Sequence, residues 1–262
     1  MDKNRLLDKA AQTDEDRILL ARVYDKITAG QRKNIPVSTC FLTKREQILA
    51  QQVLQGTPVV FFGGTADAER AVCCYVPEYL EEADLYDEDI CPICALRAEF
   101  FAEDTLTHRD FLGSLMGSGI KRETVGDIFV SKGQCDFLVT REILPYVLQN
   151  LESAGRTKLH LRQISLDEIC VPVQDTKEVR ATVSSLRLDA VIGAGFGLAR
   201  GKAADFVEAG RVTLNDMPCE KPDKAVAQGD KIALRGMGKI ILETVGGRTK
   251  KDRIGIVIRR FG

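Results

Sequence analysis

The 262-residue sequence has no apolar run that approaches the roughly 20 residues needed by a helix that crosses a bilayer. Residues 1–9 are charged and lack the apolar core of a secretory signal peptide. Hydrophobic residues make up 44% of the chain and charged residues 29%, which is ordinary for a globular protein and excludes extensive disorder. These features predict a cytoplasmic protein that is long enough for about two or three compact domains.

The sequence also lacks the residue patterns on which enzymes rely. Only two histidines, His108 and His160, are present, and neither has an evident serine or cysteine nucleophile as a partner. No glycine-rich cofactor loop follows an expected strand, and no nucleotide motif of the synthetase type occurs. We therefore expect no enzymatic activity, no catalytic residue and no cofactor. His108 fits the start of a helix that faces solvent or RNA.

Cysteine is well represented, but its distribution does not suggest a disulfide framework, because the chain is long and the residues are scattered. The pair Cys91 and Cys94, with Cys73 and Cys74, could form a four-thiolate zinc site, and the first pair alone could act as a redox dithiol. Residues three apart on a strand, however, point to opposite faces. We favour reduced cysteines in a buried sheet and expect no metal. The eight are Cys40, Cys73, Cys74, Cys91, Cys94, Cys135, Cys170 and Cys219.

Charge is distributed unevenly along the chain. Of the 37 Lys+Arg and 38 Asp+Glu residues, 16 and 9 lie between Arg180 and Gly262, which gives that segment a net charge of +7 and leaves −8 for residues 1–179. A polyanion would be attracted to the C-terminal third and repelled by much of the remainder. Charge alone does not distinguish a nucleic-acid surface from ordinary variation between domains.

The first two thirds predict a helical N-terminal region, residues 1–70, followed by a central α+β domain, residues 71–166. Apolar residues recur at helical spacing up to about residue 56, and Thr43 with Glu46 has the spacing of a capping box. The central region alternates strands and helices, which is typical of a ferredoxin-like or RNA-recognition-type (RRM-like) sandwich. Residues 167–179 are expected to connect it to the last domain.

The last domain, residues 181–262, has a different pattern. Ser184-Ser185 can cap a helix that begins at Leu186. A second short helix is expected over residues 200–209, and Gly210 follows where a left-handed C-cap is needed.

Short strands complete this domain. They are expected over residues 211–215, 231–234, 239–244 and 254–258, and Asn215-Asp216 suits a tight turn because both residues tolerate positive φ. The whole chain is therefore predicted to be α+β.

Basic side chains recur at the structural transitions of this last domain. Helix N-termini add backbone N–H donors, arginine offers a planar fork to phosphate oxygens, and lysine adds a mobile charge. Such a surface would hold an RNA backbone with little need to read bases. The candidate RNA-binding residues are Arg187, Arg200, Lys202, Arg211, Asn215, Lys221, Arg235, Lys239, Arg248, Lys250 and Lys251.

The order of these elements resembles the S-four domain, also called the alpha-L motif, a small RNA-binding domain first described in a bacterial ribosomal protein. The resemblance spans about 50 residues and depends on their order more than on any single piece. It implies an RNA-binding surface centred on the two helices. The matching stretches are 185–189, 198–203, 208–215, Lys221-Pro222 and Gly229-Asp230.

Most of the chain is similar to the YlmH-type proteins of Gram-positive bacteria, in which an N-terminal helical and α+β portion precedes an S-four domain. This resemblance implies a ribosome-associated RNA-binding protein with ribosomal RNA, transfer RNA and the large ribosomal subunit as partners, linked to translation quality control or cell division. The supporting stretches are 62–64, 108–113, 119–122, 126–128, 182–189 and 235–239.

Two other functions fit parts of the sequence. The acidic N-terminal two thirds could make the protein an interaction adaptor, and the cysteines could make it a zinc protein. The basic stretch 248–253, with Arg259-Arg260, is either a solvated face or an extension of the RNA surface.

Overall fold

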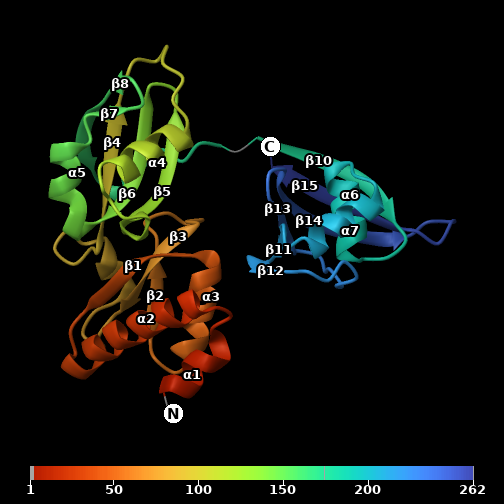
Figure 1. Cartoon of the computed structure of the whole chain (residues 1–262), viewed down its shortest axis with the longest axis horizontal. Coiled ribbons are helices and arrows are strands. Elements are labelled where there is room, and N and C mark those ends of the chain that lie inside the picture. Colours follow the sequence, from red (N-terminus) through yellow and green to blue (C-terminus); the bar gives the residue numbers. More distant parts are fainter. Residues whose placement is uncertain (1–2, 174, 262) are drawn as a thin grey trace. The chain divides into compact units, whose positions relative to one another are not determined.

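The computed structural model describes residues 3–173 and 175–261, and the chain divides into two compact units, Met1–Pro172 and Val173–Gly262. Each unit has its own sheets and its own apolar core (Figure 1). Within the described residues, no helix is long and apolar enough to cross a membrane.

The first unit begins with three helices and a small antiparallel sheet. The strand order is β1-β3-β2, so β3 lies between the other two and pairs with both. The elements are α1 (Lys3–Ala10), α2 (Asp14–Lys33), β1 (Val37–Thr43), α3 (Lys44–Val53), β2 (Val59–Phe62) and β3 (Arg70–Tyr75).

This N-terminal part is less helical than the sequence suggested. The capping box of Thr43 and Glu46 is confirmed: Thr43 Oγ1 accepts from the Glu46 N–H, and the Glu46 carboxylate accepts from the Thr43 N–H. The stretch before it is nevertheless a strand, β1, because its β-branched and aromatic residues pair with β3. Strand β3 begins at the boundary that was expected between the N-terminal region and the central domain. Tertiary pairing overrode the helical spacing on either side.

The second part of the first unit is a four-stranded antiparallel sheet with two helices. In chain order its elements follow the β-α-β-β-α-β pattern, and the strand order β5-β6-β4-β9 is that of a ferredoxin-like fold. The expectation of a ferredoxin-like or RRM-like domain is confirmed. The elements are β4 (Ile93–Glu99), α4 (His108–Gly117), β5 (Val125–Ser131), β6 (Gln134–Thr140), α5 (Leu144–Asn150) and β9 (His160–Ile164), with the short segments η1 (Glu82–Tyr86), η2 (Arg122–Thr124), η3 (Arg141–Ile143), β7 (Ser153–Ala154), β8 (Thr157–Lys158) and η4 (Leu166–Glu168).

One face of this sheet is covered by α4 and α5 (Figure 1). Leu96 and Phe137 point to that side and pack with Phe111 and Leu115 of α4 and Val147 of α5, all five fully buried. Because strand side chains alternate between faces, the neighbouring residues point the other way.

The opposite face of the sheet is also buried. Ala95 and Leu138 share a second apolar cluster with Phe41, Phe62 and Val72 of the small N-terminal sheet. RNA-recognition domains bind bases on aromatic side chains of this face. In this protein that face is occupied by the chain itself.

A salt bridge lies on the same covered face. Arg97 Nε and Nη2 each donate to the Asp136 carboxylate at 2.7 Å. Asp136 also accepts from the Cys170 N–H at 2.8 Å, and Arg97 donates to the Glu168 carbonyl at 2.8 Å. This network fixes the last segment of the first unit across the sheet.

The second unit is a six-stranded antiparallel sheet with a helix pair packed against it. The strand order is β10-β15-β14-β13-β11-β12 (Figure 1). Gly195 lets α6 approach the sheet, because a Cβ there would lie 2.7 Å from Ile240 Cδ1. The elements are β10 (Thr176–Val183), α6 (Leu188–Phe196), α7 (Arg200–Glu208), β11 (Val212–Leu214), β12 (Met217–Pro218), β13 (Lys231–Leu234), β14 (Gly238–Arg248) and β15 (Ile254–Phe261).

The start of the first helix and the start of the unit differ from expectation. Residues 176–179, expected in a connection, begin β10, which pairs along its whole length with β15. Helix α6 begins at Leu188 with Arg187 as the N-cap, and no side chain caps it, so the expected serine cap is wrong. Instead, the Leu188 and Asp189 N–H groups donate to the carbonyls of Lys224 and Pro222.

Candidate nucleic-acid interface

The helix pair of the second unit is organised around a buried carboxylate. Asp189, in the first turn of α6, is 3% exposed. Arg187 Nε and Nη2 donate to its two oxygens at 3.2 and 3.1 Å, and Arg200 Nε, at the start of α7, donates at 3.1 Å. Burial alone would raise the pKa of Asp189, but the two guanidinium groups hold it below its usual value.

This arrangement brings two of the predicted RNA-binding residues together. The side chains of Arg187 and Arg200 remain 38% and 52% exposed, so each keeps N–H groups available to solvent while Asp189 fixes its orientation. An arginine held in this way loses little side-chain entropy when it binds a phosphate. Asp189 is thus buried and bound to two arginines.

A second group of cations lies on an aromatic ring of α7. The Arg211 guanidinium lies 4.4 Å from the centre of the Phe206 ring, and Lys202 Nζ lies 5.8 Å from it. Arg211 also donates from Nη2 to the Arg235 carbonyl at 2.7 Å. The ring supports both positive charges by cation–π attraction. Phe206 was missed in the sequence, although its position four residues after Lys202 places both on one side of a helix.

Asn215 has a structural role in the turn between β11 and β12. Both Asn215 and Asp216 have positive φ, 51° and 65°, as the sequence predicted. The Asn215 amide donates to Asp230 Oδ1 at 2.8 Å and accepts from the Lys231 N–H at 2.9 Å. Its side chain therefore joins β11 to the loop before β13, and contact with RNA remains a prediction.

The other candidate residues are dispersed over loops and strand ends. Lys239 lies over the Phe261 ring at 4.9 Å, and Arg248 pairs with Asp252 at 2.6 Å. Lys221 is exposed in the loop between β12 and β13, and Lys250 and Lys251 are exposed where β14 and β15 join. The structure thus brings together Arg187 with Arg200, and Lys202 with Arg211 and the backbone of Arg235, and it leaves the others apart from these groups.

Three of the four cysteines that suggested a zinc site are divided between two apolar clusters. Cys91 and Cys74 lie in the cluster between the two sheets of the first unit, whereas Cys94 faces α4 and α5. Burial raises the pKa of the Cys73 thiol to about 12 and also raises the pKa values of the other three thiols. Among residues 3–173 and 175–261, no group of three or more His, Cys, Asp or Glu side chains is placed to hold a metal ion.

His108 is exposed at the N-terminus of α4. Partial burial of its ring and the nearby charge of Arg122 lower its pKa. A neutral imidazole at this position can donate or accept a hydrogen bond.

Comparison with known proteins gives two sequence matches. Residues 98–168, which extend from the end of β4 to η4, match the family model of the RNA-binding domain in YlmH. The ribosome-associated protein quality control protein P2 of Bacillus subtilis (strain 168) is 34% identical over 226 residues, covering 85% of this chain and 86% of that protein.

The cell division protein YlmH from Streptococcus pneumoniae has a similar fold. The superposition has a TM-score of 0.51 and 18% sequence identity, and it covers 60% of this chain and 96% of that one. At this identity the structural match supports the fold alone. The sequence matches extend over most of the chain, and from them we conclude that this chain belongs to the YlmH family.

Proposed function

We propose that this protein binds ribosomal RNA, transfer RNA or both on the large ribosomal subunit, and that it acts by binding without catalysing a reaction. The observation that carries the proposal is the pair of arginines, Arg187 and Arg200, fixed by the buried Asp189 carboxylate on the helix pair of a segment with a net charge of +7. Fixed guanidinium groups suit the regularly spaced phosphates of folded RNA.

The family gives this proposal its biological setting. The Bacillus subtilis relative is described as a ribosome-associated quality control protein, and the Streptococcus pneumoniae protein as a cell division protein. A role in translation quality control would place the protein in the cytoplasm, where ribosomes work. The positive charge of the C-terminal third agrees with binding to ribosomal RNA. The S-four resemblance of residues 185–230 supports the second unit as the main RNA contact.

Sedimentation of cell extract through a sucrose gradient tests the proposal. At low salt the protein should sediment with the large ribosomal subunit, and at high salt it should return to the top, because phosphate contacts weaken steeply with salt. Sedimentation with a non-ribosomal partner would instead favour an interaction adaptor that uses the acidic first unit. Sedimentation as a free protein at both salt concentrations would contradict both functions.

A matched pair of variants connects this result to the second unit. The triple variant R200Q/K202Q/R211Q removes two charges from α7 and one from the loop that follows it, and it should lose ribosome association at low salt. The control R32Q/K33Q/K9Q removes three charges from exposed residues of α1 and α2 and should sediment like the wild type. Equal loss of association in the two variants would show that total charge, and not this surface, governs association.

A further inference from the structure

Two arginines in the first unit lie side by side without a carboxylate partner. Arg70 of β3 is half-buried, and its Nη2 donates to the carbonyl of Arg122, which precedes β5. Burial lowers the pKa of both guanidinium groups, and the charge of Arg70 lowers the pKa of Arg122 further, against a smaller opposing effect of the Asp127 carboxylate on both. Among the described residues, neither forms an ion pair with Asp or Glu.

Backbone carbonyls hold both guanidinium groups on one side only. Arg70 donates from Nε to the Val125 carbonyl at 3.0 Å and from Nη2 to the Phe41 carbonyl at 3.1 Å. Arg122 donates from Nη1 to the carbonyls of Val125 and Gly126 at 2.6 and 3.3 Å. These bonds use Nε and Nη2 of Arg70 and Nη1 of Arg122. The remaining N–H groups are available to a ligand, and the bonds already made fix the orientation of each side chain.

These donors line a cavity of about 560 Å³ at the junction of the two sheets of the first unit. Lys121 adds a third positive charge from its exposed position beside Arg122. The apolar part of the wall suits a ribose or a base, and it comes from Leu19, Phe41, Met116 and Ile120.

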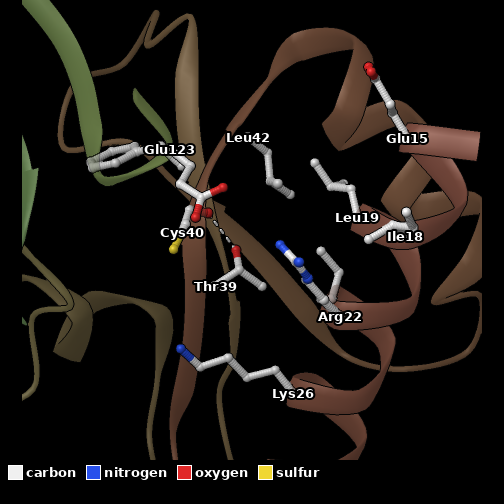
Figure 2. A pocket seen from close by; sticks show the side chains of 11 residues that line it. Glu15, Ile18, Leu19, Arg22, Lys26, Thr39, Cys40, Leu42 and Glu123 are labelled. Atoms are coloured by element: carbon white, nitrogen blue, oxygen red, sulfur yellow. Dashed lines mark hydrogen bonds between the residues drawn. The ribbon is translucent and has the colours of Figure 1, made fainter. Parts of the chain in front are cut away.

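Two carboxylates also reach this cavity, those of Glu46 and Glu123. Glu46 accepts from the Thr43 N–H and hydroxyl at 2.6 and 2.9 Å. Figure 2 shows the Glu123 carboxylate beside Cys40 and Thr39, in the adjoining cavity between α2 and β1. Their negative charges oppose a run of phosphates. The site therefore has room and charge for a single phosphate group.

We propose that Arg70, Arg122 and Lys121 form a second phosphate-binding site, on the first unit, which takes one phosphodiester of an RNA strand. This inference rests on the RNA binding proposed above and adds a contact outside the second unit. RNA is the source that fits best, because the face on which an RNA-recognition sheet stacks bases is covered, whereas this junction is open. Phosphodiesters of RNA and free phosphate share the same chemistry, so the experiment separates them.

Binding of the full chain to purified ribosomes over a series of salt concentrations tests the site. R122Q should weaken binding about tenfold, as expected for one charge-assisted contact. It should also reduce the magnitude of the slope of log K against log salt by about 0.7–0.9. R122K should restore most of the slope, since it keeps the charge. K132Q, at the exposed β5–β6 turn, is the matched control and should leave the slope unchanged.

Folding must be separated from binding, because Arg122 holds the start of β5. Urea unfolding of each variant identifies those that remain folded, and K121Q, which changes an exposed side chain, provides a second route if R122Q unfolds. A folded R122Q or K121Q with the slope of K132Q would overturn the inference. If the R200Q/K202Q/R211Q variant also bound like the wild type, the proposed function would fail as well. If that variant alone lost binding, the proposed function would stand without this site.

Side-chain NMR distinguishes the source of the phosphate. Adenosine monophosphate at millimolar concentration should shift the Nε–Hε signals of Arg70 and Arg122, and adenosine should not. Shifts with inorganic phosphate but not with the monophosphate would assign the site to free phosphate and overturn the proposal. Absence of any shift would overturn it too.

Discussion

At the scale of single residues, buried carboxylates position several arginines of this protein. Asp189 orients Arg187 and Arg200 in the second unit, and Asp16 binds Arg45 in the first, with distances of 2.7 and 2.6 Å from its two oxygens to Arg45 Nη1 and Nη2. In both cases removal of the acid leaves an arginine without its acceptor. The consequences differ, because only the first pair of arginines is exposed on the proposed RNA surface.

Asp189→Asn should lower both stability and RNA affinity. The amide keeps the shape but loses charge-assisted hydrogen bonds to two arginines, which should lower the free energy of unfolding by about 1–3 kcal/mol. Ribosome affinity should fall severalfold, since Arg187 and Arg200 lose their common anchor. Urea unfolding and ribosome binding measure the two effects, and Asp205→Asn, an exposed change on α7, is the control. Full affinity in a folded Asp189→Asn protein would show that the anchor does not matter for binding.

Asp16 should give the first unit an acid-dependent stability. The hydrogen bond from Arg45 is the largest influence on its carboxyl and, against the cost of burial, lowers its pKa from 3.8 to about 2. A pKa that is lower in the folded chain stabilises the protein above pH 4, and this contribution is lost as the pH falls from about 4 to about 2.

Comparison of wild type and Asp16→Asn tests this pH dependence. The variant should be less stable than the wild type at pH 7, and the difference in unfolding midpoint should shrink as the pH approaches 2. Asp14→Asn removes a charge from the same helical turn and serves as the control. A difference that stayed constant from pH 7 to pH 2 would contradict the role given to the ionised Asp16 carboxylate.

At the scale of elements, turns with positive φ were predictable from residue type, whereas the start of α6 and one edge strand were not. Gly210 has φ of 65°, and Asn215-Asp216 form a turn with positive φ, both as their residue types indicate. Strand β10 was missed because its lysine, glutamate and arginine side chains are exposed at the edge of the sheet, where no apolar alternation is required. Its pairing with β15 is set by contacts far away in the sequence, which local patterns do not contain.

The candidate site was also predictable only where it depends on local sequence. The sequence identified the basic residues of the helix pair, because their spacing places them at helix starts. It could not identify the shared acceptor, Asp189, or the ring of Phe206, because both roles depend on how α6 and α7 pack. Arg70 and Arg122 were not among the candidates, since 52 residues separate them in the chain and only the two sheets bring them together.

Asn215→Ala should distinguish a structural role from an RNA contact. The change removes two hydrogen bonds, to Asp230 and Lys231, and places alanine at φ of 51°, so we expect a loss of about 1–3 kcal/mol in stability. Ribosome affinity, measured well below the melting temperature, should be unchanged. Thermal melting and the binding assay measure the two effects. A stable variant that binds weakly would instead make Asn215 an RNA contact.

At the scale of the whole molecule, positive and negative charge are concentrated in different parts of the chain. The second unit, in the segment with a net charge of +7, presents arginines and lysines on a helix pair, whereas residues 1–179 carry −8. The acidic remainder should repel most of an RNA surface and restrict contact to local positive sites. Orientation on RNA would then follow from where the few positive groups lie, with little contribution from base-specific contacts.

We propose above all that the basic residues of the helix pair in the second unit contact RNA phosphates. The most direct test is the slope of log K against log salt for binding to purified ribosomes. We expect R200Q/K202Q/R211Q to lower the magnitude of this slope by about 2–3, one phosphate for each charge removed, and R32Q/K33Q/K9Q to leave it unchanged. Equal slopes for wild type and R200Q/K202Q/R211Q would contradict the claim.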